Sequence, residues 1–213
     1  MICKKKEVYA LDVYEAIKRR RSIRKFKKES ISQDQLEKLI EVARFAPSGS
    51  NVQPWRFVIV KDNPIKSELC KASYKQKFVE DASIVIVCCG DLLSWKRVKE
   101  TSREILKDKQ IQLSKKTKDA LEVRTNKAAL AEMNERMPTT LLNVAIAIEH
   151  IVLEAVELGL GSCWVRLFDE KKIKQTLNLP DHLCVVAILP IGVPDEDPPP
   201  RPRMSVSAIR SIM

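Results

Sequence analysis

Residues 139–158, TTLLNVAIAIEHIVLEAVEL, decide the fold of this 213-residue chain. Gly159 follows the stretch, and glycine is the residue type that most often ends a helix. Apolar residues stand at 141, 142, 144, 145, 148, 151, 152, 155 and 156, which is more than the single stripe of a one-sided helix. We therefore predict a helix at the centre of the protein, with the other elements packed around it.

Strands and further helices flank this helix on both sides. Segments rich in β-branched and aromatic residues predict strands at 54–62, 83–90, 161–169 and 183–194, and the continuous apolar run at 83–90 predicts a strand buried on both faces. Helices are predicted at 11–20, 33–45, 63–79 and 170–177, the second of them after a capping box of Ser32 and Gln35. Because the βαβ rhythm and the GxGxxG fingerprint are both absent, we predict a layered α+β domain rather than a Rossmann fold.

The composition is that of an ordinary globular domain. Apolar residues make up 45% and charged residues 31% of the chain, and its length favours one domain, 1–213, over two. No apolar run predicts a membrane span and the N-terminus shows no secretory signal, so we expect a cytoplasmic protein with no membrane partner. The polar, lysine-rich segment 92–136 predicts a variable helical cap, and the proline-rich residues 194–213 predict an extended C-terminal arm.

Cysteine and histidine usage points away from metal and thiol chemistry. The six cysteines show no CxxC spacing, and two histidines are too few to complete a zinc pattern. Cys88 and Cys89 fall inside a predicted strand, where we interpret them as small apolar residues. No Ser/His/Asp or Cys/His constellation can be assembled, so we predict no catalytic side chain.

The run RRRSIRKF, residues 19–26, places five cations around one serine. Such a density is found at a solvated helix end, in a nucleic-acid patch and in a pocket that holds an anion. The net charge of +10 favours an anionic partner without choosing among these. Lysines are also spread along the whole chain, and a dispersed excess is weaker evidence for nucleic acid than a basic arm. The run alone leaves all three interpretations open.

Four segments, in this order and spacing, resemble the flavin-dependent nitroreductase family: RRRSIRKF, APSGSNVQPWRFVIV at 46–60, LGLGSCWVRLFD at 158–169 and LPIGVPDEDPPPRPR at 189–203. The resemblance covers nearly the whole chain except about 92–136. It implies a three-layer α/β/α fold with a central, mostly antiparallel mixed sheet. It also implies an FMN-dependent oxidoreductase that passes hydride from NADH or NADPH through the flavin to a small acceptor, such as a nitroaromatic or a quinone.

The resemblance further implies which residues hold the flavin. The basic run and a C-terminal arginine pair would bind the phosphate, for which guanidinium groups are suited because they pair with it bidentately. The loop after Ala46 would reach the flavin from the neighbouring subunit, and the segment before Phe168 would place backbone amides near flavin N5. Relatives often have aspartate at the position of Asn143, and many have glycine where this chain has Arg166 and Leu167. The predicted cofactor-binding residues are Arg20, Arg21, Ser22, Arg24, Pro47, Ser48, Gly49, Asn51, Gln76, Asn143, Trp164, Val165, Arg166, Leu167, Arg201 and Arg203.

A homodimer with composite flavin sites and a small-molecule acceptor is the assembly that the resemblance implies. Three alternatives stay open. The chain could act on another substrate within the same fold, by reductive dehalogenation or flavin fragmentation, with 92–136 setting that choice. It could also bind flavin without turnover, or it could bind nucleic acid, although we expect no nucleic-acid partner.

Overall fold

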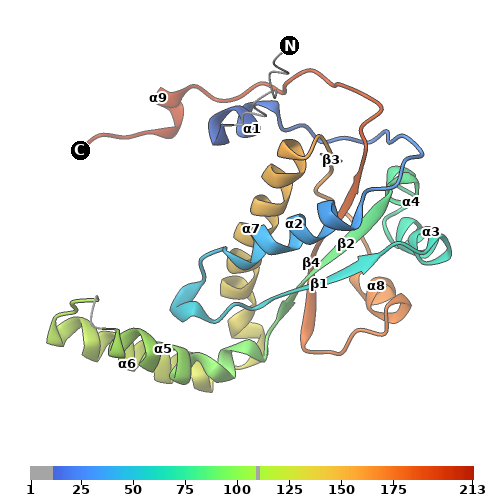
Figure 1. Cartoon of the computed structure of the whole chain (residues 1–213). Helices are drawn as coiled ribbons and strands as arrows, with labels where there is room; N and C mark the ends of the chain where they lie inside the picture. The colour runs from blue at the N-terminus through green and yellow to red at the C-terminus, as the bar shows by residue number, and fades with distance from the viewer. Residues whose placement is uncertain (1–11, 109–110) are drawn as a thin grey trace, which may run out of the picture.

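The computed structural model describes residues 12–108 and 111–213, and a four-stranded sheet lies at its centre (Figure 1). The strand order is β1-β2-β4-β3, with β1 at Trp55–Val60, β2 at Ile84–Asp91, β3 at Gly161–Ser162 and β4 at Leu183–Gly192. All three strand pairs are antiparallel. The parallel component of the predicted mixed sheet is reduced to one isolated bridge between Ser22 and Ser162.

Helices cover both faces of this sheet. The helices of the described residues are α1 (Val13–Arg19), α2 (Gln33–Arg44), α3 (Asn63–Ala72), α4 (Phe78–Asp81), α5 (Val98–Lys107), α6 (Lys115–Leu130), α7 (Met133–Glu157), α8 (Glu170–Thr176) and α9 (Val206–Ile209), with 3-10 turns η1 (Gly49–Asn51) and η2 (Ser94–Arg97). Of these, α2 and α7 lie on one face of the sheet, and α3 and α8 lie on the other. The predicted start of the first helix at Leu11 lies outside the described residues. The capping box at Ser32 is confirmed, since Ser32 and Gln35 each bond the other's backbone amide.

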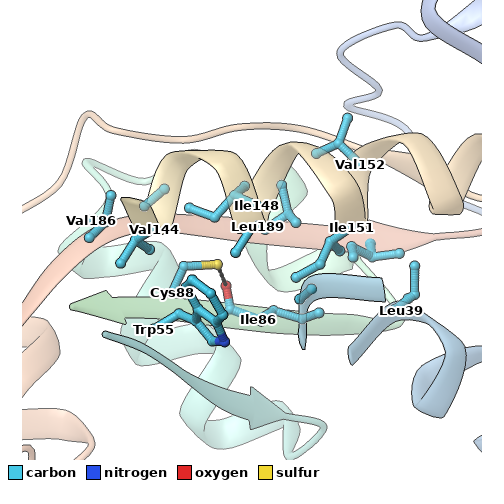
Figure 2. Close-up of a cluster of buried hydrophobic side chains, with 14 of the residues drawn as sticks. Leu39, Trp55, Ile86, Cys88, Val144, Ile148, Ile151, Val152, Val186 and Leu189 are labelled. Atoms are coloured by element: carbon cyan, nitrogen blue, oxygen red, sulfur yellow. Dashed lines mark hydrogen bonds between the residues drawn. The ribbon is translucent and has the colours of Figure 1, made fainter. Parts of the chain in front are cut away.

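Every residue of β2 is buried, as its continuous apolar sequence predicts. Successive side chains of a strand point to opposite faces, so Ile84, Ile86 and Cys88 share one face and the residues between them share the other. The first face packs in one core cluster with Leu39 of α2 and Ile148 of α7 (Figure 2). The second face joins a separate cluster that includes residues of α3 and α8. Helices, sheet and helices therefore form the three predicted layers of an α+β fold.

The central helix is confirmed as α7, but it begins at Met133 rather than at residue 139. Pro138 lies inside it, near enough to the N-terminus that its missing amide disturbs only the first turns. Among the described residues, α7 is also the one helix long and apolar enough to span a membrane. Its buried side includes Val144 and Ile151 and packs on the sheet and α2, as the core helix of a globular protein does.

Two predicted elements are shorter in the structure. The helix expected at 63–79 ends at Ala72, because Tyr74 and Lys75 adopt positive φ angles of 54° and 60° before the short α4 begins. The strand expected at 161–169 is only the two-residue β3. Beyond it, the Cys163 amide donates to the carbonyl of Pro190, and a proline has no amide to return the bond, so the ladder weakens there.

The segment 92–136 contains a helical hairpin, α5 and α6, that projects away from the sheet (Figure 1). Arg136 anchors it: one guanidinium nitrogen donates to the carbonyl of Leu92 at 3.2 Å and the other to that of Ala129 at 3.2 Å. These carbonyls stand at the two ends of the hairpin, so one buried side chain holds both. The predicted C-terminal arm is extended up to Ser205, but α9 then interrupts it.

Buried cysteines are core residues in this structure. Cys70, Cys88, Cys89, Cys163 and Cys184 are all buried and free, while Cys3 lies outside the described residues. Burial raises the pKa of the Cys89 thiol to about 12, which suppresses the reactive thiolate at neutral pH.

Candidate functional site

The basic run and the C-terminal arm meet at a cavity of about 490 Å³. Residues of α1 and the segment after it line one side, and residues 198–203 line the other. Six of the predicted cofactor-binding residues belong to this lining: Arg20, Arg21, Ser22, Arg24, Arg201 and Arg203. Residues separated by about 180 positions are thus brought into one strongly cationic pocket.

Backbone pairing between the two segments builds the pocket. The Lys27 amide donates to the carbonyl of Val193 at 2.9 Å, and the Asp195 amide donates to the carbonyl of Lys25 at 2.9 Å. Glu196 then accepts hydrogen bonds from the amides of Arg24 and Lys25. Together these contacts fix where the arm leaves the body of the protein, before it reaches Arg201.

The arginine side chains around the pocket make different contacts. Arg21 donates through Nε to the carbonyl of Pro198 at 3.1 Å and through Nη1 to two carbonyls of its own segment, so it ties the arm to the basic run. Arg24 stacks over the Phe78 ring with its guanidinium carbon 5.8 Å from the ring centroid. Arg201 has no side-chain partner among the described residues. The pocket therefore combines one anchoring arginine with others that can bind an anion.

Arg20 lies 3.9 Å through Nε from a carboxylate oxygen of Glu149 on α7. Burial raises the pKa of Glu149, while the nearby Arg20 and His150 act to lower it. A contact of this length in a half-exposed setting is a weak ion pair. Arg20 is accordingly free to pair with a stronger anion in the pocket.

A second part of the predicted site lies next to the basic run. The Ile23 amide donates to the carbonyl of Ser162 at 2.9 Å, which sets the basic run beside residues 163–167. Gln76 donates from Nε2 to the carbonyl of Leu167 at 2.9 Å, so this predicted contact also positions the segment. Val165 exchanges both backbone hydrogen bonds with Ile188.

The backbone amides of residues 164–167 are not equivalent. The Val165 amide is used within the sheet, which leaves it poorly placed to donate to a flavin. No acceptor among the described residues pairs with the amides of Arg166 and Leu167. Both side chains are exposed. The segment thus offers two backbone donors at its exposed end.

The loop that carries Pro47, Ser48, Gly49 and Asn51 lies elsewhere. The Gly49 amide donates to Oδ1 of Asn143 at 3.2 Å, whereas Arg20 approaches the same helix at Glu149, six residues further along α7. Six helical residues correspond to about 9 Å along the axis. Within one subunit, the loop and the cationic pocket therefore contact α7 at different points along its length.

This loop has a strained backbone. Ser50, Asn51 and Gln53 have φ angles of 52°, 53° and 50°, in the left-handed region that non-glycine residues seldom adopt. The hydroxyl of Ser48 accepts from the Gln53 amide at 2.9 Å and closes the turn. Strain of this kind persists only where surrounding contacts hold it, and it is frequent at ligand-binding positions.

Asn143 contacts the loop rather than the basic run. Its Oδ1 accepts from Gly49, but its buried Nδ2 has no partner among the described residues. An unpaired buried donor is costly, so this amide can still donate to a group that enters the site. Pairing with Gly49 makes Asn143 first of all a residue that positions the loop.

Trp95 and Thr140 also support the loop, and the sequence did not identify them. Trp95 donates from Nε1 to the hydroxyl of Thr140 at 2.8 Å, and a Cβ placed on Gly49 would lie 3.7 Å from the Trp95 ring. The ring packs with Val52 and Val98. Trp95 thereby joins the loop, α7 and the base of the α5–α6 hairpin. The available signal was one tryptophan within an otherwise polar, lysine-rich segment.

Known proteins that resemble this chain match it over nearly its full length. The sequence pattern described as "Nitroreductase family" matches residues 17–193. A Thermus thermophilus protein named NADH dehydrogenase is 30% identical over 93% of this chain and 95% of its own. A Thermotoga neapolitana protein named iodotyrosine deiodinase is 31% identical over 91% and 95%. A solved nitroreductase-type structure from Exiguobacterium sibiricum, in complex with FMN, superposes with a TM-score of 0.80 at 22% identity, covering 96% of this chain and 98% of that one, which shows a shared fold.

Replacing Thr140 by valine tests the support of the loop. The change keeps the side-chain shape but leaves the buried Trp95 donor unpaired, so we expect a loss of about 1–3 kcal/mol in the free energy of unfolding. Chemical denaturation measures it. In a Trp95→Phe background the same replacement should cost at least about 0.5 kcal/mol less, because the donor is already gone. Equal costs in both backgrounds would contradict the role of this hydrogen bond.

Proposed function

This chain belongs to the nitroreductase family, and from that premise we propose that it is an FMN-dependent oxidoreductase. It takes hydride from NADH or NADPH and reduces a small electron acceptor such as a nitroaromatic or a quinone. The observation that carries the proposal is the cationic pocket of about 490 Å³ where two distant segments of the chain meet. Among the described residues, no group of three or more histidine, cysteine or acidic side chains is arranged to hold a metal ion.

The residues of the pocket fit a flavin phosphate. Arg20, Arg24, Arg201 and the hydroxyl of Ser22 would hold it, with Arg21 and Arg203 shaping the arm around it. Charge-assisted hydrogen bonds from guanidinium groups are the strongest that a protein offers to phosphate. A terminal phosphate fits FMN better than FAD, since the chain lacks the dinucleotide fingerprint.

Bound FMN would supply the redox chemistry, by accepting hydride from the nicotinamide and passing electrons to the acceptor. The residues of the chain would orient the flavin and enclose it. Gln76 donates to the carbonyl of Leu167 and so positions this segment, whose amides at Arg166 and Leu167 would be available as donors to the bound flavin ring. No side-chain nucleophile is needed for this chemistry, and burial raises the pKa of the thiols of Cys70, Cys88, Cys89, Cys163 and Cys184.

The working unit in this proposal is a cytoplasmic homodimer in which each flavin is held by two subunits. The loop with Gly49 contacts α7 about two turns before Glu149, and in the proposed dimer it would complete the site of the partner. Apolar side chains are exposed where a partner would cover them: Leu142 on α7 is 63% exposed, and Val13 and Ile17 on α1 are 67% and 53% exposed. The arm ends in further exposed apolar residues of α9.

Reductive dehalogenation is the second candidate, because the Thermotoga neapolitana relative is named iodotyrosine deiodinase. Both candidates need the same flavin site, so the acceptor distinguishes them. An acceptor panel should therefore include a halogenated phenol beside a nitroaromatic and a quinone.

A spectrum of the purified protein tests the proposal directly. We expect flavin absorbance, release of FMN on heating, and bleaching of the flavin band on anaerobic addition of NADH or NADPH. A nitroaromatic or quinone should restore the band. Recovery of FAD, absence of any flavin after reconstitution, or a flavin that neither nucleotide reduces would contradict it.

Replacing Arg20 or Arg24 by alanine should weaken FMN binding. Each change removes a charge-assisted contact worth about 1.5–3 kcal/mol, which corresponds to about tenfold or more in the dissociation constant. Quenching of flavin fluorescence on binding measures it. Arg19→Ala is the matched control, because Arg19 neighbours the pocket in sequence but faces Glu15 at 3.9 Å outside it. Unchanged FMN affinity in both pocket variants would place the phosphate elsewhere.

Mixing two inactive variants tests the shared site. Arg20→Ala damages the phosphate pocket and Asn51→Ala damages the loop, so a mixed dimer regains one site with both contributions intact. We expect up to about a quarter of wild-type activity after subunit exchange, since half of the dimers are mixed and each has one good site. A monomer in light scattering that binds FMN and oxidises NAD(P)H at full rate would refute the shared site.

A further inference from the structure

A second, larger cavity of about 870 Å³ shares Arg24 with the first. The segment 24–30, the N-terminal turns of α3 and the stretch from α4 into β2 enclose it. Six cationic side chains take part in its lining: Arg24, Lys25, Lys27, Lys28, Lys61 and Lys66. None of the predicted flavin contacts except Arg24 belongs to this lining.

Lys66 makes this cavity unusual, because the residue is only 5% exposed. Its ammonium donates one hydrogen bond, to the carbonyl of Ala82 at 2.6 Å. The other two N–H groups of the Lys66 ammonium have no acceptor among the described residues. No carboxylate of the described residues forms an ion pair with Lys66. Burial lowers the pKa of Lys66, against the opposing attraction of Asp81 and Glu80. An anion in the cavity would offset the cost of burying this charge.

The acidic residues of the lining do not cancel its positive charge. Glu80 and Asp81 both face Lys77, at 3.0 Å and 3.7 Å from its ammonium, and Lys77 is outside the lining. Glu29 and Asp195 are the remaining carboxylates. Lys25, Lys27 and Lys28 form no ion pair with any described residue, so the lining keeps a net excess of unpaired cations.

We propose that this cavity is a binding site for a small phosphate-bearing anion, with Lys66 at its base and Lys27, Lys28 and Lys61 at its rim. Clustered ammonium groups suit phosphate as point charges with rotatable donors. The volume of about 870 Å³ is more than one phosphate group fills, which favours a ligand with two phosphates over orthophosphate. The site does not depend on the flavin proposal, although the two pockets share Arg24.

Isothermal titration with pyrophosphate tests the site, on the full-length protein with FMN in excess and at constant ionic strength. We expect one pyrophosphate bound per chain, with at least tenfold weaker binding after Lys66→Met and after the double change Lys27→Met with Lys28→Met. Lys116→Met with Lys118→Met on α6 is the control: it removes the same charge as the rim variant from exposed positions outside the cavity and should change the affinity less than twofold. Orthophosphate should bind more weakly than pyrophosphate.

Three results would overturn the proposal. One is the absence of binding to the wild-type protein at millimolar pyrophosphate. The second is an equal effect of the rim and control variants, which would indicate diffuse attraction to a basic protein. The third is a loss of binding in Arg201→Gln but not in the rim variant, which would place pyrophosphate in the other pocket. Should Lys66→Met not fold, the rim variant decides, and a circular dichroism melt identifies that case.

Discussion

Both faces of β2 must be kept from water, and the arrangement of the molecule follows from how they are covered. Its eight residues are all buried, so helices are required on each side of the sheet. The helix α7 covers one side along much of its length, and α3 and α8 cover the other. The same helix contacts both parts of the proposed flavin site, through Asn143 under the strained loop and through Glu149 beside Arg20. The spacing of these two parts is therefore set by the helix that covers the strand.

Backbone pairing shapes the cationic pocket more than ion pairs do. The Lys25 carbonyl accepts from the Asp195 amide, and the Lys27 amide donates to the Val193 carbonyl. Glu196 accepts from backbone amides of the basic run rather than from its guanidinium groups. The use of backbone hydrogen bonds instead of ion pairs affects how the pocket can bind an anion. A pocket held together by arginine–carboxylate pairs would have to break them to admit an anion, whereas here the backbone holds the walls and leaves Arg24 and Arg201 available.

Much of the fold could be predicted from the sequence, because burial and helix capping depend on residues that are close together in the sequence. The apolar run of β2 and the capping box at Ser32 are examples, and the family fold followed from four ordered segments. The misses have non-local causes. The strand β3 is short because of Pro190, which lies on β4 and is distant in the sequence. The left-handed turn at Tyr74 and Lys75 contains no glycine, so the sequence gives no signal for it. The role of Trp95 was not predicted, because it depends on contacts with Thr140 and Gly49, which are distant from Trp95 in the sequence.

The joining of residues 24–27 to residues 193–196 also separates the binding of an anion from the folding of the core. All four strands precede residue 193 in the chain, so the sheet is built without the residues that form the second wall of the cationic pocket. Arg201 and Arg203 belong to that wall and lie outside the buried core. A chain cut after residue 193 would therefore keep the covered faces of β2 but lose half of the pocket.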